Sequence, residues 1–248
     1  MRELIRKAGK LLLLIRVPLF RRGLWRGRVA AGIEHKAVLT TREIDLVVDV
    51  GANRGQFSLA VRRWQPRAEI VAFEPLSGPA DKYERLFAGD SRVRLHRIAI
   101  APAAGRMPMH ISGSEDASSL LAIGALQAKH FPGTRATDET MVDAAPLTDF
   151  VDAKRIAKSA LLKIDVQGFE LEVLKACGAL LPLFSWIYVE ASFVPLYDGQ
   201  SLVDEVIAHL DRAGFKLAGV FNLQTTAEER LPLQADFLFE RREMDTAV

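Results

Sequence analysis

The sequence predicts an α/β protein with a Rossmann-like, doubly wound and mostly parallel sheet. Short apolar runs alternate with segments of helical periodicity, which is the pattern of strand–helix–strand units. The runs are apolar throughout rather than alternating, as expected for parallel strands covered by helices on both faces. The last two runs, 216–221 and 236–240, have no helix between them. We therefore expect these two strands to form an antiparallel pair at one edge of the sheet.

The first half of the sheet is predicted from residues 44–100. A first strand over 44–50 is rich in β-branched residues, which favour strands. A helix over 56–64 follows a glycine turn and ends before Pro66, because proline cannot continue a helix. The other predicted elements of this half are a strand over 70–73, a helix over 79–87 and a strand over 93–100.

The second half begins with a buried strand that ends at Asp165. Gly178 and Gly214 mark the ends of the two helices that come later, since glycine commonly follows a helix C-terminus. The predicted elements are strands over 160–165 and 186–190 and helices over 171–177 and 202–213. Residues 101–148 lack this rhythm. We interpret them as an irregular insertion on the substrate side, because long irregular segments in compact domains are usually functional loops.

The turn after the first strand carries two glycines within the run Asp-Val-Gly-Ala-Asn-Arg-Gly. In open α/β sheets such a turn lies at the carboxyl end of its strand, where ligands bind. Gly51 and Gly55 have no Cβ, so a ligand can approach the backbone and positive φ angles are accessible. The amides of the following helix start point towards the same space. Asn53 stands where a dinucleotide motif has its middle glycine, and the Lys-Ser/Thr ending of a P-loop is absent.

Four predicted strands end in an acid or carry one near the end. These acids are Asp49, Glu74, Asp165 and Glu190. The carboxyl ends of parallel strands meet at one edge of a sheet, so we expect the four carboxylates to form a site there. Glu74 comes about twenty residues after the glycine turn, the position from which an acid accepts hydrogen bonds from ribose hydroxyls in nucleotide-binding folds.

The chain resembles the FkbM-type methyltransferases over about residues 44–240. The resemblance rests on the glycine turn, on Phe73-Glu74-Pro75, on Ser118-Ser119-Leu120 and, most specifically, on residues 162–175. It implies a class I methyltransferase fold with S-adenosylmethionine as cofactor. It also implies O-methylation of a hydroxyl on a sugar, glycolipid or polyketide-like acceptor, often in polysaccharide biosynthesis. The family usually has Glu where this chain has Gln167. Any role that this carboxylate has in the family is therefore not available to this chain.

The glycine turn, the strand-end acids and the resemblance together give a set of expected site residues. The cofactor is expected to contact Asp49, Gly51, Asn53, Gly55, Gln56, Phe57, Glu74, Pro75, Ala99 and Asp165. Methyl transfer requires the acceptor oxygen to be aligned with the methyl carbon and the sulfur, and a hydroxyl also needs a base or a metal. In this fold class Asp165 ends the strand that faces the methyl group. We assign Asp165 to the acceptor hydroxyl or to the methionine part of the cofactor.

Two other carboxylates, Glu170 and Glu190, are reserve candidates for the catalytic base. A Mg²⁺ ion between Asp165 and Glu190 is an alternative, because carboxylate oxygens suit this cation. Gln167 removes one potential ligand from that place. We therefore predict no metal site.

Two other functions remain open from the sequence alone. A nicotinamide-dependent oxidoreductase shares the fold and an acid at the position of Glu74, but it needs the glycine that Asn53 replaces. The second is a non-catalytic binding module that a basic arm recruits to an anionic surface. Nucleic-acid binding is not expected, because the body of the chain is acidic.

Charge divides the chain into a basic N-terminal arm, residues 1–43, and a methyltransferase-like body, residues 44–248. Of the 33 Lys and Arg residues, eleven lie in residues 1–42, together with only two of the 31 Asp and Glu residues. Residues 1–17 predict an amphipathic helix, and Trp25 follows among arginines, as in segments at membrane interfaces. We expect residues 1–28 to pack on the body as a lid or to contact an anionic membrane, two compatible roles.

The sequence also bounds the compartment. The single cysteine excludes an internal disulfide, which fits a reducing compartment. Neither a cleavable signal peptide nor an apolar run of the ~20 residues that a membrane span needs is recognised. We expect a cytoplasmic enzyme with a small-molecule, glycan or glycolipid acceptor, peripheral to the inner face of the membrane where the arm contacts lipid.

Overall fold

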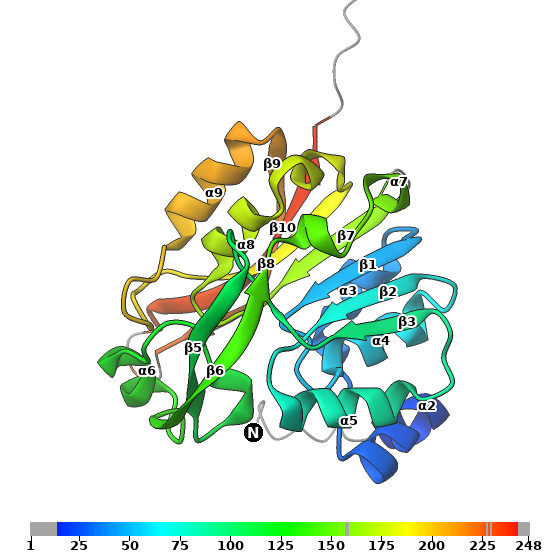
Figure 1. Ribbon diagram of the computed structural model, residues 1–248, viewed down its shortest axis with the longest axis horizontal. Helices are drawn as coiled ribbons and strands as arrows, with labels where there is room; N and C mark the ends of the chain where they lie inside the picture. Colours follow the sequence, from blue (N-terminus) through cyan, green and yellow to red (C-terminus); the bar gives the residue numbers. More distant parts are fainter. Residues whose placement is uncertain (1–13, 157–158, 227, 229, 243–248) are drawn as a thin grey trace, which may run out of the picture.

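A seven-stranded sheet forms the centre of the protein (Figure 1). The computed structural model describes residues 14–156, 159–226, 228 and 230–242. The strand order is β3-β2-β1-β7-β8-β10-β9. Five neighbouring strands run parallel, and β10 is antiparallel to both β8 and β9. The bounds are β1 Leu46–Val50, β2 Glu69–Phe73, β3 Val93–His96, β7 Ala160–Ile164, β8 Trp186–Ser192, β9 Phe215–Thr225 and β10 Pro232–Arg241. The predicted α/β sheet with an antiparallel edge pair is confirmed.

The carboxyl ends of β1, β2 and β7 lie level with one another. Val50 pairs with Phe73 on one side and with Ile164 on the other. The residues that follow these strands, Gly51, Glu74 and Asp165, therefore leave the sheet side by side at one edge. β8 continues two residues beyond Glu190, so Glu190 lies within its strand rather than at the predicted end.

Helices cover both faces of the sheet, as β1 already indicates: Val47 and Val48 belong to different apolar clusters. The face of Val47 packs against α3, α4 and α5, and the face of Val48 packs against α8 and α9. The bounds are α3 Lys36–Thr40, α4 Gln56–Trp64, α5 Ser77–Phe87, α8 Glu170–Ala176 and α9 Val203–Arg212. The predicted helices at 56–64, 79–87, 171–177 and 202–213 are present with shifts of a few residues.

A second, three-stranded sheet lies in the segment that was expected to be irregular. It has the order β4-β6-β5, with bounds β4 Ala99–Ile100, β5 Gly105–Ser112 and β6 Ala136–Ala145, and with α6 Ala125–His130 between β5 and β6. The predicted strand over 93–100 is wrong in part, because the chain leaves the main sheet after His96 and β4 joins the second sheet. β6 is exposed along most of its length. Such a strand lacks the continuous apolar run on which the sequence interpretation depended.

The described part of the N-terminal arm packs on the body. It contains α2 Pro18–Arg22, a π-helical turn Gly23–Gly27, a short 3-10 helix Ile33–His35 and α3. Phe20 is fully buried, and its ring lies 5.8 Å from that of Trp64 on α4. Figure 1 draws α2 beside α5 at the lower edge of the molecule. Most of the predicted amphipathic helix over 1–17 lies outside the described residues.

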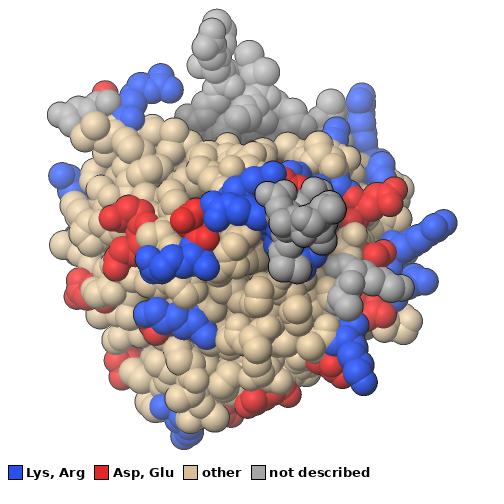
Figure 2. Space-filling view, turned by 90° about the horizontal axis from the view of Figure 1, so that it is seen from above, with Lys and Arg blue, Asp and Glu red and all other residues tan. Residues whose placement is uncertain are grey.

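The face at the amino ends of the parallel strands carries both signs of charge (Figure 2). α7, Ala153–Ile156, lies on this side, just before β7. Ion pairs join Arg155 to Glu69 at 2.6 Å and Arg242 to Asp211. The mixture of charges gives this face no large field of one sign. Across the described ranges, no helix combines the length and the apolar character that crossing a bilayer requires.

Candidate active site

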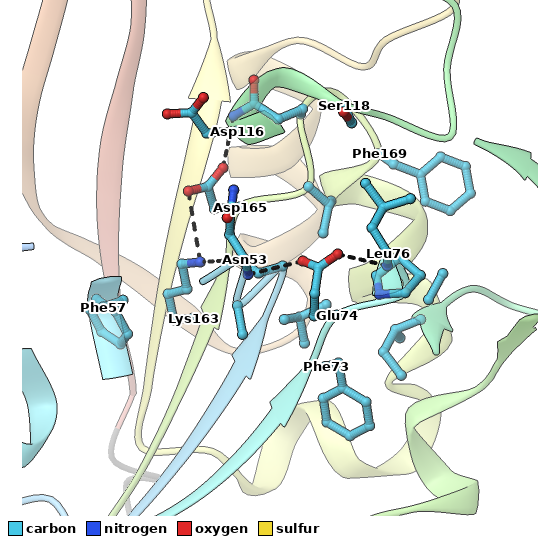
Figure 3. Close-up of a pocket in the computed structure, with 18 of the residues that line it drawn as sticks. Asn53, Phe57, Phe73, Glu74, Leu76, Asp116, Ser118, Lys163, Asp165 and Phe169 are labelled. Atoms are coloured by element: carbon cyan, nitrogen blue, oxygen red, sulfur yellow. Dashed lines mark hydrogen bonds and ion pairs between the residues drawn. The ribbon is translucent and has the colours of Figure 1, made fainter. Parts of the chain in front are cut away.

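A cavity of about 230 Å³ lies over the carboxyl ends of β1, β2 and β7 (Figure 3). Its walls come from the β1–α4 turn, the end of β2, the second sheet, the loop before α6 and the β7–α8 turn. Eight of the predicted site residues line it: Gly51, Asn53, Gln56, Phe57, Glu74, Pro75, Ala99 and Asp165. The structure thus brings together most of the residues that the sequence indicated, at the edge where ligands bind in open α/β sheets.

Close packing requires both glycines of the β1–α4 turn, and Gly51 also lines the cavity. Gly51, Asn53 and Gly55 have φ angles of 76°, 46° and 92°, in the left-handed region that favours glycine. A Cβ on Gly51 would lie 1.9 Å from the carbonyl oxygen of Asp165, and a Cβ on Gly55 would lie 2.8 Å from the ring of Phe87. Gly55 does not line the cavity. Its conformation was predicted, but the neighbour it accommodates is a helix and not a cofactor.

Glu74 is held in one orientation by the backbone around it. Its two carboxylate oxygens accept hydrogen bonds from the amides of Asn53 and Leu76, both at 2.9 Å. Burial raises the pKa of Glu74 to about 7, and the two amide hydrogen bonds oppose the shift. Figure 3 shows the carboxylate between the turn and Leu76, on the wall of the cavity. Each oxygen has a second lone pair that can accept a hydrogen bond from a ligand hydroxyl.

Lys163 joins the acids of β1 and β7 in the interior. Its ammonium group donates to the carbonyl oxygen of Gly51 at 2.9 Å, and it lies 3.1 Å from Asp49 and 3.7 Å from Asp165. Burial lowers the pKa of Lys163, but the two carboxylates outweigh that effect and the pKa is raised. Asp49 is fully buried and also accepts a hydrogen bond from Ser58 at 2.7 Å. Asp49 therefore anchors Lys163 below the cavity and does not line it.

Gln167 separates the two acids between which a Mg²⁺ ion had been considered. Its amide nitrogen donates to Asp165 at 2.8 Å and to Glu190 at 2.9 Å, and its amide oxygen accepts from Tyr197 at 2.8 Å. Glu190 accepts a further bond from Gln234 at 3.0 Å. Within the described residues, no group of three or more His, Cys, Asp and Glu side chains is arranged to hold a metal ion. The neutral amide thus occupies the place between the carboxylates.

Replacing Gln167 by Glu is expected to destabilise this arrangement at neutral pH. The substitution exchanges the shared donor for a third carboxylate, so Asp165 and Glu190 each lose a hydrogen bond and gain a repulsive neighbour. A loss of about 1–3 kcal/mol in the free energy of unfolding is expected for buried groups left unpaired. Urea unfolding measures it. Addition of Mg²⁺ tests whether an ion bound by the three carboxylates restores the stability of the variant. Equal stability of the two proteins without metal would contradict the expected role of the amide.

Glu170 lies below the β7–α8 turn and does not reach the cavity. One of its oxygens accepts from the amide of Gly168 at 2.9 Å and from that of Val166 at 3.3 Å. Burial raises its pKa to about 7, against these backbone hydrogen bonds. The carboxyl group thus holds the turn that carries Gln167. This placement favours a structural role over the catalytic role considered from the sequence.

The variant Glu170→Gln should keep turnover and change the pH dependence of stability. A raised pKa means that the folded protein binds the proton more tightly, so stability falls as pH rises from about 4.5 to about 7, by up to about 3 kcal/mol for this group. Glutamine keeps the accepting oxygen and removes this contribution. Urea unfolding at about pH 6 and about pH 8 compares the two proteins. A large loss of turnover in the variant would return Glu170 to the catalytic candidates.

The second sheet and its loop close the other side of the cavity. Asp116 and Ser118 line it from the loop after β5. Ser119 donates to the carbonyl oxygen of Gln167 at 2.6 Å, and the Tyr197 hydroxyl lies 3.1 Å from the carbonyl oxygen of Ala117. The loop is therefore fastened to the β7–α8 turn. The Ser118-Ser119-Leu120 motif in the sequence identified this segment, but it did not indicate that the loop contacts the β7–α8 turn.

The cavity-wall residues that the sequence interpretation did not predict include Lys163 and His35. Lys163 is a charged residue within an otherwise apolar strand, and this unusual position could have indicated a role in the site. His35 comes from the N-terminal arm and lies 3.0 Å from the Tyr188 hydroxyl and 3.6 Å from Asp236. Burial lowers the pKa of His35, while Asp236 opposes the shift. No spacing along the chain could predict a contact between its first and last parts.

The order of the strands and the position of the cavity define the class of protein: this is the Rossmann-like fold of class I methyltransferases. Residues 49–217 match the methyltransferase FkbM domain. The chain belongs to the FkbM methyltransferase family, and the resemblance seen in the sequence is confirmed.

Curated relatives are similar over about two thirds of the chain. The 2-O-methyltransferase NoeI of Sinorhizobium fredii is 27% identical over 161 residues, which cover 62% of this chain and 66% of NoeI. The methyltransferase sdnD of Sordaria araneosa is 28% identical over 196 residues, which cover 69% of this chain and 73% of sdnD. Among solved structures, magnesium protoporphyrin IX methyltransferase from Synechocystis PCC 6803 with bound SAM is 12% identical. That alignment covers 83% of this chain and 76% of the other, with a TM-score of 0.45.

Proposed function

We propose that the protein transfers a methyl group from S-adenosylmethionine to a hydroxyl oxygen of an acceptor. The observation that carries this proposal is the arrangement of one cavity with Glu74 over the end of β2 and Asp165 over the end of β7. The first position suits the ribose of an adenosine and the second suits the reacting centre. Membership in the FkbM methyltransferase family supports the same reaction.

The residues of the cavity fit an adenosine-containing cofactor. The Glu74 carboxylate accepts from ribose hydroxyls, and Phe73, Ile98 and Ile100 offer apolar surface to a base at the same end of the cavity. The β1–α4 turn offers backbone polar groups to the remainder. Bound there, S-adenosylmethionine supplies an electrophilic methyl group. The protein itself has to bind the cofactor and the acceptor, to orient them and to accept one proton from the acceptor hydroxyl.

Asp165 is the carboxylate that is placed to receive this proton. Its side chain is 40% exposed and lines the cavity, whereas Glu170 and Glu190 are occupied by backbone and glutamine donors. An ion pair with Lys163 and a hydrogen bond from Gln167 fix the orientation of the Asp165 carboxylate. A base held within hydrogen-bond reach of an acceptor hydroxyl contributes about 10²–10⁴ to the rate. We therefore assign the acceptor hydroxyl to the space next to Asp165.

The acceptor class is part of the proposal. NoeI is named a 2-O-methyltransferase, which supports oxygen as the methylated atom. We propose a hydroxyl of a sugar, glycolipid or polyketide-like molecule in the cytoplasm, in a pathway such as polysaccharide biosynthesis. The family match disfavours the nicotinamide-dependent oxidoreductase and the non-catalytic module that the sequence left open.

Three measurements test the proposal. Calorimetry with S-adenosylmethionine, S-adenosylhomocysteine and NAD separates the cofactors, and binding of NAD alone would overturn it. Release of S-adenosylhomocysteine is then followed with free sugars, lipid-linked glycans and polyhydroxylated polyketides as acceptors. Product analysis by mass spectrometry and NMR locates the new methyl group, and methylation at nitrogen or carbon would contradict the assignment to a hydroxyl.

A further inference from the structure

The outward face of the N-terminal arm presents a tryptophan among arginines. Phe20, Gly23, Leu24 and Gly27 face the body, and the opposite positions hold Pro18, Arg21, Arg22 and Trp25. The Trp25 side chain is 75% exposed, and the guanidinium group of Arg21 lies 5.8 Å from the centre of its ring. Arg28, also exposed, ends the helical segment. We call Arg21, Arg22, Trp25 and Arg28 the basic face.

Among the residues that the structure describes, no acidic side chain pairs with the basic face. Residues 14–33 contain five arginines and no acid. Within the ranges that the structure describes, Arg21, Arg22 and Arg28 form no ion pair. The acids of the neighbouring α5 and the loop after it have other partners: Asp81 and Glu84 pair with Arg97, and Asp90 pairs with Arg62. The positive charge of this face is therefore available to an anionic partner.

A groove beside the basic face combines cationic and apolar groups. It lies between α2 and the loop after α5, and Leu19, Leu86, Arg22 and Arg92 are among the residues that line it. Guanidinium groups bind phosphate, and leucines suit the first carbons of an acyl chain. Tryptophan is enriched at membrane–water interfaces, where its ring lies at the level of the headgroups. Stacking on nucleic-acid bases uses several aromatic residues along a concave channel instead.

We propose that the basic face docks on an anionic lipid bilayer, with Trp25 at the level of the headgroups and the arginines on lipid phosphates. The packing of α2 on α4 and α5 holds the basic face outward while the arm stays folded. The arm can therefore pack on the body and contact a membrane in the same conformation. The arm continues into His35, a wall residue of the cavity. Docking thus holds the enzyme at the surface where lipid-linked acceptors occur. The proposal does not depend on which acceptor is methylated.

Vesicle binding of the full-length protein tests the proposal. We expect co-sedimentation with phosphatidylglycerol-containing vesicles, little with phosphatidylcholine alone, and weakening by salt, which screens such contacts. Each arginine near an anionic surface contributes about fivefold to binding, or about 1 kcal/mol. The triple variant Arg21→Gln, Arg22→Gln, Arg28→Gln should therefore bind about a hundredfold more weakly. Trp25 emission should shift to shorter wavelength on binding, and Trp25→Phe should remove that shift.

The matched control is a second triple variant, Arg94→Gln, Arg106→Gln, Arg135→Gln, which removes the same charge from exposed positions away from the arm. Equal weakening in both triple variants would reduce the effect to net charge and overturn the proposal. Binding that survives in the first triple variant, but is lost in a chain starting at Leu14, would move the contact to the first thirteen residues and also overturn it. Preference for single-stranded RNA over vesicles would assign the face to nucleic acid instead. Calorimetry with S-adenosylmethionine on each variant reports separately on the proposed function.

Discussion

The substitution Asp165→Asn is expected to lower turnover by roughly 10²–10⁴, the contribution of a positioned base. It keeps the shape of the side chain. The oxygen of the introduced amide can still accept from Gln167, and Lys163 keeps its contacts with Asp49 and with the carbonyl of Gly51. We therefore expect S-adenosylmethionine to bind with an affinity within about tenfold of the native protein. Turnover is measured by release of S-adenosylhomocysteine, and affinity by calorimetry.

Two further variants make this result specific. Asp116→Asn removes another carboxylate that lines the cavity, from the loop opposite Asp165, and it should leave most of the turnover intact. His35→Gln removes a histidine from the cavity wall. If affinity for the cofactor collapses together with turnover in Asp165→Asn, Asp165 binds the methionine part of the cofactor. If Asp165→Asn retains its turnover and His35→Gln does not, the base is His35.

The affinity for S-adenosylmethionine is expected to fall about 10–100-fold when Glu74 is replaced by alanine. In the proposed pose the carboxylate accepts from the ribose hydroxyls, and losing charge-assisted hydrogen bonds of this kind costs about 1.5–3 kcal/mol. Calorimetry measures the change. Because Glu74 also holds the amides of Asn53 and Leu76, the melting temperature of the variant must be measured beside it. Unchanged affinity would count decisively against this position for the ribose.

The same contact can be tested in the unmodified protein through pH. Since the pKa of Glu74 is raised to about 7 by burial, the carboxylate gains a proton as pH falls through that value. The protonated form is a weaker acceptor, so cofactor affinity should decrease below about pH 7 and level off above it. An affinity that is constant from about pH 6 to about pH 8 would contradict a change of Glu74 protonation at the ligand in this range.

Much of the main sheet was predictable because buried parallel strands have a strong signal. The helix at Gln56–Trp64 has the predicted bounds, and Glu74 and Asp165 emerge at the same edge because β1 pairs in register with β2 and β7. Such positions depend on local periodicity and on a general rule for parallel sheets. Both are properties that a single sequence contains.

Other features could not be predicted, because the role of a side chain depends on partners that are distant in sequence. Glu170 and Glu190 resemble candidate bases until their donors are known: two backbone amides for the first and two glutamine amides for the second. The glycines of the β1–α4 turn were predicted to have positive φ, and they do, but Gly55 accommodates a helix. The second sheet was not predicted because β6 is exposed along most of its length and lacks an apolar run.

The position of β10 has a consequence for how the protein is made. This strand lies between β8 and β9 in space but is the last to be synthesised. A nascent chain that ends before Pro232 leaves β8 as an open edge, with the unpaired hydrogen-bonding groups that promote aggregation. The partners of His35 are then incomplete as well, because Asp236 has not yet emerged. Synthesis from the N-terminus therefore produces β1, β2 and β7, whose carboxyl ends carry the cavity, before the sheet is closed. The β10 strand, which is synthesised after them, both closes the sheet and completes the polar contacts of His35.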